Sequence, residues 1–383
     1  MRRYDLDWLR VIVFGLLIIY HVGMFFVPWD FHLKNNFIYG WVTWPMLFLN
    51  QWRLPILFVI SGMGTWYALG KRNAWQFSGE RIKRLLLPLV FGMIFIIPPQ
   101  VYVERLAKGQ FTGSYFEFWP SLAFIGTYPE GNLSWHHLWF LPYLLLYSLL
   151  LTPLFVYLKN KPDNAYLRKL ETWISGVRPQ LLWVLLPFYF TYTILQEFFP
   201  VTHNFTNDWF TMVNYFFFFI AGFSLAGVGQ SFWDKVRMNR RKLLMAGMLS
   251  FTVYILMNWF IEHTVTMHFI RNAFKVVNIW LWITVCFGYA AQYLNRESKL
   301  LRNANEAVYP FYILHQSVMM VIAYWVRDWN WGFWPKASLM ILGTFGISYL
   351  IYEFLIRRWK TVRPLFGMKN GELKRARVSL SRL

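Results

Sequence analysis

Ten apolar stretches of about 20 residues follow one another along the chain, separated by polar segments. A helical run of this length spans the hydrocarbon core of a bilayer, where backbone groups must hydrogen-bond within their own segment. The alternation of apolar and polar residues that a membrane β-barrel requires is not seen. The pattern therefore predicts an all-α membrane protein, a bundle of about ten transmembrane helices near residues 8–28, 45–69, 85–103, 138–158, 180–198, 209–228, 243–262, 274–294, 308–327 and 336–357.

The basic residues between these runs predict how the chain is oriented. If the N-terminus is cytoplasmic, 29 of the 38 Lys and Arg residues fall in inner segments and seven fall in outer segments. Lys and Arg concentrate in cytoplasmic loops, so we expect both the N-terminus and the C-terminus to be cytoplasmic. The longest outer segment is 104–137, and its many aromatic residues favour an ordered, functional loop.

Composition supports the membrane assignment and narrows the partners. Hydrophobic residues make up 57% of the chain and charged residues 15%, against about 25% charged residues in soluble domains. The net charge of +20 would suit nucleic acid, but the basic residues lie in short loops and form no stripe, so no nucleic acid is expected. We expect a single transmembrane domain over residues 1–370 and a basic cytoplasmic tail, 371–383, near anionic lipid.

The first helix carries three ionisable residues, Asp7, Arg10 and His21. Eleven positions at about 100° each place Arg10 and His21 on one helix face, about 16 Å apart along the axis. Asp7 can pair with Arg10 at a spacing of three. Two plainer roles stay open, because Arg10 can extend to lipid phosphate and His21 can bond a neighbouring helix.

Further polar residues mark both ends of the predicted bundle. Ser61 and Gly62 allow close helix packing, and Arg81 and Arg84 can bind phosphate groups or lipid headgroups. The adjacent His136 and His137 do not share a helix face, which argues against their ligating one metal ion, and no metal site is expected. Further candidates are Trp135 and Trp139 for a substrate at the outer mouth, the intramembrane His315, and Glu353, which can also pair with Arg357.

These residues, in this order, resemble the integral membrane acyltransferases of acyltransferase family 3. The resemblance rests on Asp7-x-x-Arg10-x10-His21, Phe58-Val59-Ile60-Ser61-Gly62, Arg81 and Arg84, His137-Leu-Trp-Phe-Leu, Tyr312-x-x-His315 and Tyr352-Glu353. It implies a ten-helix core in the bacterial inner membrane, a cytoplasmic acyl-CoA donor and a carbohydrate acceptor on the outer side. The acyl group would be acetyl or succinyl, and the acceptor would include osmoregulated periplasmic glucan.

Acyl transfer from a thioester needs a base for the acceptor hydroxyl and donors for the developing oxyanion. We expect His21 to be that base, with Asp7, His315 and Glu353 completing the catalytic set; whether His21 or His315 is the main base stays open. Acyl-CoA would be held by Arg10, Arg81, Arg84 and Ser61, and the acceptor by His137, Trp135 and Trp139.

Two other classes of protein compete with this interpretation. A transporter of a small anionic or sugar-like solute would also have many helices and buried charges, but it would be expected to show internal repeats and broken helices. A structural lipid-scaffold protein would have no need to align Arg10 with His21. The expected partners are the lipid bilayer, acyl-CoA and a carbohydrate acceptor, and a homodimer is left open.

Overall fold

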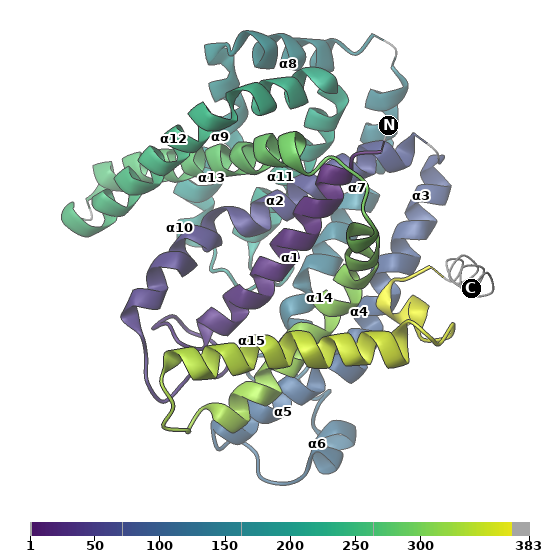
Figure 1. Cartoon of the computed structure of the whole chain (residues 1–383), viewed down its shortest axis with the longest axis vertical. Coiled ribbons are helices and arrows are strands. Elements are labelled where there is room, and N and C mark those ends of the chain that lie inside the picture. The colour runs from purple at the N-terminus through teal and green to yellow at the C-terminus, as the bar shows by residue number, and fades with distance from the viewer. Residues whose placement is uncertain (1, 71, 162, 263, 370–383) are drawn as a thin grey trace. The chain divides into compact units, whose positions relative to one another are not determined.

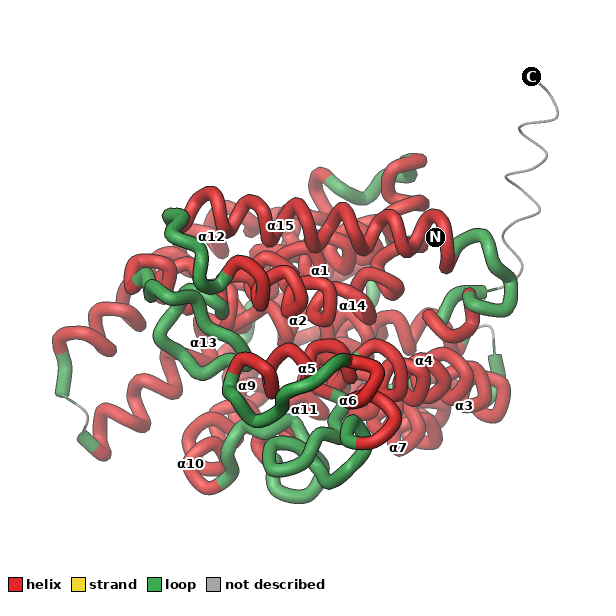
Figure 2. Tube along the Cα trace, turned by 90° about the horizontal axis from the view of Figure 1, so that it is seen from below, coloured by secondary structure: helices red, strands yellow, loops and turns green. Residues whose placement is uncertain are grey.

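A computed structural model describes residues 2–70, 72–161, 163–262 and 264–369, and these residues form helices and loops without a strand (Figures 1 and 2). The predicted tail, 371–383, lies outside the described residues. The α-helices are α1 (Tyr4–Met24), α2 (Thr43–Leu69), α3 (Ala74–Arg81), α4 (Leu87–Phe91), α5 (Pro98–Ala107), α6 (Tyr115–Ser121), α7 (Phe140–Asn160), α8 (Ala165–Gly176), α9 (Leu182–Phe190), α10 (Gln196–Phe198), α11 (Trp209–Val228), α12 (Gln230–Phe260), α13 (Val265–Tyr293), α14 (Lys299–Val326) and α15 (Phe333–Leu350).

The predicted number of membrane spans is confirmed, because ten helical segments of the described chain are long and apolar enough to cross a bilayer. Several of them begin earlier than the apolar pattern suggested. The third starts at Ala74 rather than at residue 85, and α12 starts at Gln230 rather than at 243. Helical hydrogen bonding continues through these polar, basic turns, where hydropathy carries no signal. The ten segments are Tyr4–Met24, Gly40–Leu69, Ala74–Ala107, His136–Asn160, Pro179–Phe198, Trp209–Val228, Gln230–Phe260, Val265–Tyr293, Lys299–Val326 and Phe333–Ile356.

Two shorter helices were not predicted from the apolar pattern. In α8, the side chain of Asn164 accepts hydrogen bonds from the first-turn backbone amides, and Leu167 and Leu170 are buried. In α6, Ser114 and Glu117 form a reciprocal capping box. Both helices depend on their caps and a few buried side chains. Helix α6 shows that part of the 104–137 segment is ordered, as its aromatic residues led us to expect.

The chain divides into two compact units, which we describe separately. The first unit comprises residues 1–13, 47–78 and 146–301. In it, α12 and α13 pack along each other (Figure 1). Gly62 of α2 lies against the α11 backbone, where an added Cβ would be 2.0 Å from the carbonyl oxygen of Phe219. The Ser61-Gly62 step therefore serves close helix packing, as its composition suggested.

The second unit comprises residues 14–46, 79–145 and 302–383, of which 302–369 are described. Its buried core brings the C-terminal end of α1 and the residues that follow it against α14 and α15, through Val22, Phe25, Phe26, Met319, Met320, Ala323 and Met340. Two π-helical turns, Ile82–Leu86 and Gly92–Ile96, interrupt the α3–α5 segment. Side chains bond the second turn, since Trp119 Nε1 donates to the carbonyl of Ile94 and Ser317 Oγ to that of Ile96. This unit holds the histidines described next.

Candidate functional site

Three intramembrane histidines meet in the second unit. His21 on α1 and His315 on α14 are 2.9 Å apart between Nδ1 and Nε2, with their rings nearly parallel. The ring of His137 lies edge-on to His315, with 5.0 Å between the ring centres. His315 is completely buried, His137 is buried and His21 is half-buried. The fold therefore joins residues that the sequence could single out only one at a time.

The hydrogen bonds fix which ring nitrogens carry protons when the histidine pair is neutral. His315 Nδ1 lies 2.7 Å from the carbonyl oxygen of Tyr312, which can only accept. His315 Nδ1 therefore carries the proton, and its Nε2 accepts from His21 Nδ1. The lone pair of His21 consequently lies on Nε2. A neutral imidazole oriented in this way is a proton acceptor of the kind that general-base catalysis uses.

His137 is held by the same helix that carries His315. Its Nε2 donates to the carbonyl of Ile313 at 3.0 Å, and the Tyr312 hydroxyl donates back to the carbonyl of His137 at 2.6 Å. The Tyr312 ring packs against Phe14 and Phe140. These bonds hold the start of the fourth span against α14. The ring of His137 is oriented by the carbonyl of Ile313 and by the side chain of Gln100, whose Nε2 lies 3.4 Å from His137 Nδ1.

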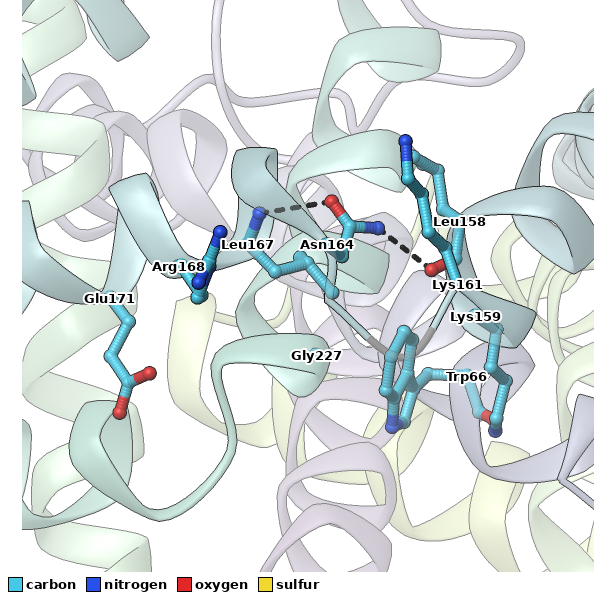
Figure 3. Close-up of a pocket in the computed structure, with 9 residues that line it drawn as sticks. All are labelled: Trp66, Leu158, Lys159, Lys161, Asn164, Leu167, Arg168, Glu171 and Gly227. Carbon is cyan, nitrogen blue, oxygen red and sulfur yellow. Dashed lines mark hydrogen bonds between the residues drawn. The ribbon is translucent and has the colours of Figure 1, made fainter.

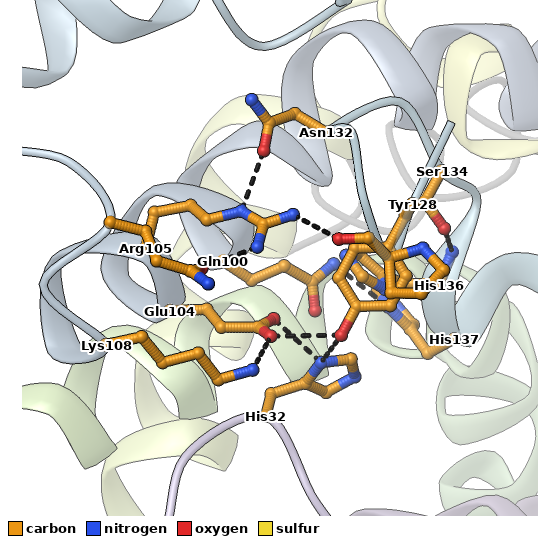
Figure 4. Close-up of polar contacts among 12 residues, drawn as sticks. His32, Gln100, Glu104, Arg105, Lys108, Tyr128, Asn132, Ser134, His136 and His137 are labelled. Atoms are coloured by element: carbon orange, nitrogen blue, oxygen red, sulfur yellow. Dashed lines mark hydrogen bonds and ion pairs between the residues drawn. The ribbon is translucent and has the colours of Figure 1, made fainter. Parts of the chain in front are cut away.

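A second polar cluster, which no sequence motif indicates, joins His32 to residues of the 104–137 region of the same unit. Glu104 receives hydrogen bonds on Oε1 from Lys108 at 2.5 Å and from the Tyr128 hydroxyl at 3.0 Å, and its Oε2 lies 2.8 Å from His32 Nδ1 (Figure 4). The ring of His136 is edge-on to His32, with 4.7 Å between ring centres. Burial and the Glu104 carboxylate raise the pKa of the Tyr128 hydroxyl above its usual range.

The adjacent histidines therefore belong to different clusters. His137 contacts His315, whereas His136, whose φ is +37°, turns toward His32 and Glu104. The expectation that these neighbouring histidines do not bind one metal ion together stays a prediction. His32 stands in a loop without any motif around it, so only the many aromatic residues of the 104–137 segment pointed to this part of the chain.

The residues expected to hold acyl-CoA belong to neither of these two clusters and are divided between the two units. In the first unit, Arg10 pairs with Asp7 at 3.0 Å, as their spacing predicted, and the Ser61 hydroxyl donates to the carbonyl of Leu57. In the second unit, Arg84 lies 3.5 Å from Glu80 and donates to the carbonyl of Gly367 at 3.4 Å. Arg81 is half-buried one turn before Arg84. Their role toward acyl-CoA stays a prediction.

The remaining candidates have structural neighbours of their own. Glu353 pairs with Arg357 at 2.8 Å, which is the alternative that their spacing allowed. Trp139 is buried and packs edge-on against Tyr143. Trp135 is half-buried and directly precedes His136 in the chain. The catalytic role of Glu353 and the substrate role of the two tryptophans stay predictions.

A cavity of about 280 Å³ opens in the first unit, between α8 and the ends of α2, α7 and α11 (Figure 3). Lys159, Lys161 and Arg168 contribute positive charge to its wall, and Arg168 pairs with the exposed Asp163 at 2.8 Å. Asn164 closes one side by bonding Leu158 and Leu167. None of the residues predicted to be functional lines this cavity.

Comparison with known proteins identifies relatives along almost the whole chain. A family model described as an acyltransferase domain matches residues 3–353. Glucans biosynthesis protein C of Escherichia coli strain K12 is 22% identical over 365 residues, which cover 93% of this chain and 92% of the relative. The protein of the same name from Escherichia coli O157:H7 has the same identity and coverage. No solved structure matches the chain.

Proposed function

This chain belongs to acyltransferase family 3 and is a membrane acyltransferase, and from that premise we propose that it transfers an acetyl or succinyl group from cytoplasmic acyl-CoA to a hydroxyl of an extracytoplasmic carbohydrate. The observation that carries the proposal is the His21–His315 pair, whose hydrogen bonds leave the lone pair of His21 on Nε2. The inner membrane of a bacterium is the proposed location.

In the proposed reaction, His21 Nε2 takes the proton of the acceptor hydroxyl as its oxygen attacks the thioester carbonyl. The new C–O bond forms an ester, the C–S bond breaks, and the proton passes to the departing thiolate of coenzyme A. Positive charge on His21 during this step is shared through its Nδ1–H bond to His315 Nε2. His315 keeps its own proton on Nδ1, against the carbonyl of Tyr312.

Several features support the expected substrates. Arg81 and Arg84 stand on a segment that the charge distribution assigns to the inner side, where their guanidinium groups suit the phosphates of coenzyme A. Arg10 and Ser61 are proposed for the same donor. The relatives are named for glucan biosynthesis, which supports a glucan as the acceptor; His137, Trp135 and Trp139 are proposed to contact it.

The proposal is tested with purified protein in lipid vesicles, supplied with labelled acetyl-CoA or succinyl-CoA and an oligosaccharide acceptor. His21→Ala should lower kcat by about 10²- to 10⁴-fold, the usual contribution of a general base. His268→Gln in the first unit is the control, because its ring bonds the carbonyl of Thr193, and it should retain activity. Near-normal turnover by folded His21→Ala would refute the assignment of the base.

A further inference from the structure

The second polar cluster has the composition of a metal site. His32, Glu104 and His136 each offer one ligand atom, and these atoms lie within 4.8 Å of one another. Tetrahedral coordination at the usual zinc distances places ligand atoms about 3.4 Å apart, so small side-chain rotations would complete the geometry. The residues come from three separate places in the chain, which the fold of the second unit brings together.

A second observation concerns the imidazole of His136. Its Nε2 is shielded from solvent and has no hydrogen-bond partner, although a buried polar nitrogen normally finds one. The residue also adopts a left-handed backbone conformation, with φ at +37°, which is costly for a side chain other than Gly and tends to occur at functional positions. A metal ion bound between the three side chains would supply the missing partner.

The neighbouring side chains support the ligands. Lys108 and Tyr128 bond Oε1 of Glu104, which leaves Oε2 directed at His32. Such outer contacts orient ligands in metal proteins. The nearby guanidinium of Arg105 is held by Asn132, Gln110 and the carbonyls of Pro129 and Gly131. The positive charges of Lys108 and Arg105 oppose the binding of any cation, so binding depends on strong ligand bonds. Mg²⁺ and Ca²⁺ rely on oxygen ligands, of which the site offers a single carboxylate. Two imidazoles and a carboxylate instead favour a transition metal.

We propose that His32, Glu104 and His136 form a binding site for Zn²⁺ or a similar divalent transition-metal ion. Binding of the ion replaces the hydrogen bond between His32 Nδ1 and Glu104 Oε2. Three protein ligands leave the fourth tetrahedral position for water or a hydroxyl group. His136 is next to His137 in the chain, so the metal lies beside the histidine cluster. A role in binding the acceptor hydroxyl rests on the proposed acyl transfer, whereas metal binding does not.

The test uses the full-length chain, purified in detergent with a tag that contains no histidine, stripped with a chelator and titrated with Zn²⁺ and Co²⁺. We expect about one ion per chain and visible absorption from bound Co²⁺. His32→Ala, Glu104→Gln and His136→Ala should each weaken the affinity by about tenfold or more. The control is His268→Ala, which lies in the first unit and should bind as the unchanged protein does.

Thermal unfolding gives a second measurement, because a ligand that binds only the folded state raises Tm. Zn²⁺ should raise the Tm of the unchanged chain and of His268→Ala, but not that of Glu104→Gln. Equal binding and equal Tm shifts in the unchanged chain and in a variant lacking all three ligands would overturn the metal site. If the protein transfers acyl groups but does not bind Zn²⁺, the metal site is refuted and the proposed function stands. If it binds Zn²⁺ but transfers no acyl group, the proposed function is refuted and the metal site stands.

Discussion

The position of one proton on His315 determines which nitrogen of His21 can accept a proton. His315 donates its Nδ1 proton to the carbonyl of Tyr312, three residues earlier on the same helix. That bond makes His315 Nε2 an acceptor for His21, and it places the basic nitrogen of His21 away from His315. In the proposed reaction, His315 is therefore a positioning residue for His21, and the two imidazoles should act as one unit.

This coupling predicts a non-additive pair of substitutions. His315→Ala should lower kcat by about 10- to 100-fold, the size seen when a partner that orients a metal-binding histidine is removed, with little change in the KM for the acyl donor. The double variant His21→Ala/His315→Ala should be no slower than His21→Ala alone, because the second change removes a partner that no longer acts. The measurement is kcat for the unchanged protein, the two single variants and the double variant. If the fold-losses in kcat of the two single variants multiply in the double variant, the two histidines act independently.

The buried imidazole of His203, in the loop between the fifth and sixth spans, should make the stability of the folded protein depend on pH. Burial lowers the pKa of His203 from 6.5 to about 4. Both the folded and unfolded chains hold this imidazole neutral above pH 6.5. As the pH falls from 6.5 to 4, only the unfolded chain takes up the proton, so this residue makes the folded state progressively less stable.

The measurement compares Tm against pH for the unchanged protein and for His203→Gln in the same detergent. The Tm of the unchanged protein should fall more steeply between pH 6.5 and 4, while the two curves should run parallel above pH 6.5. Parallel curves over the whole range would contradict the shifted pKa. The backbone amide of His203, which bonds Asp208 at 2.7 Å, is kept in the variant.

At the scale of helices, two glycines set how closely α2 and α11 approach. An added Cβ at Gly62 would be 2.0 Å from the Phe219 carbonyl oxygen, and one at Gly222 would be 2.0 Å from that of Val59. Backbone atoms cannot rotate away as a flexible side chain can. The two helices must therefore separate if either glycine gains a side chain, which is the role of small residues between membrane helices.

Gly62→Val should accordingly destabilise the first unit by at least about 1–3 kcal/mol, the typical cost of overpacking, and should lower Tm. The matched control is Gly64→Val on the same helix, because nothing lies within 4 Å of a Cβ added there. Its β-branched side chain carries the same intrinsic helix cost, so the difference between the two variants isolates the helix contact. An equal loss of stability in both would show that α2 and α11 do not depend on this approach.

At the scale of the whole molecule, an even number of spans predicts that the two ends of the chain lie on the same side of the membrane. The distribution of Lys and Arg predicts that this side is the cytoplasm. It also assigns the predicted outer segment 104–137, which contains Glu104 and His136, to the outer side. The direction of acyl transfer in the proposed function depends on this orientation.

Cysteine labelling tests the orientation, because Cys286 is the single cysteine of the chain. In a Cys286→Ala background, Glu130→Cys should react with a membrane-impermeant maleimide added to intact spheroplasts, and Arg237→Cys should react only after the membrane is opened. Both positions are exposed in their own units. The reverse pattern would place the proposed acyl-CoA side outside and would invalidate the proposed direction of transfer.

The sequence alone determined the helical class, the number of spans and the polar residues worth examining, because a bilayer imposes length and hydrogen-bonding rules on each segment separately. It also determined local pairs such as Asp7 with Arg10 and Glu353 with Arg357, which follow from helix spacing. Only the tertiary structure decided that His21 meets His315, 294 positions away, and that His136 turns toward His32 and Glu104. Such contacts arise from how helices and loops pack, and no local pattern of residues encodes them.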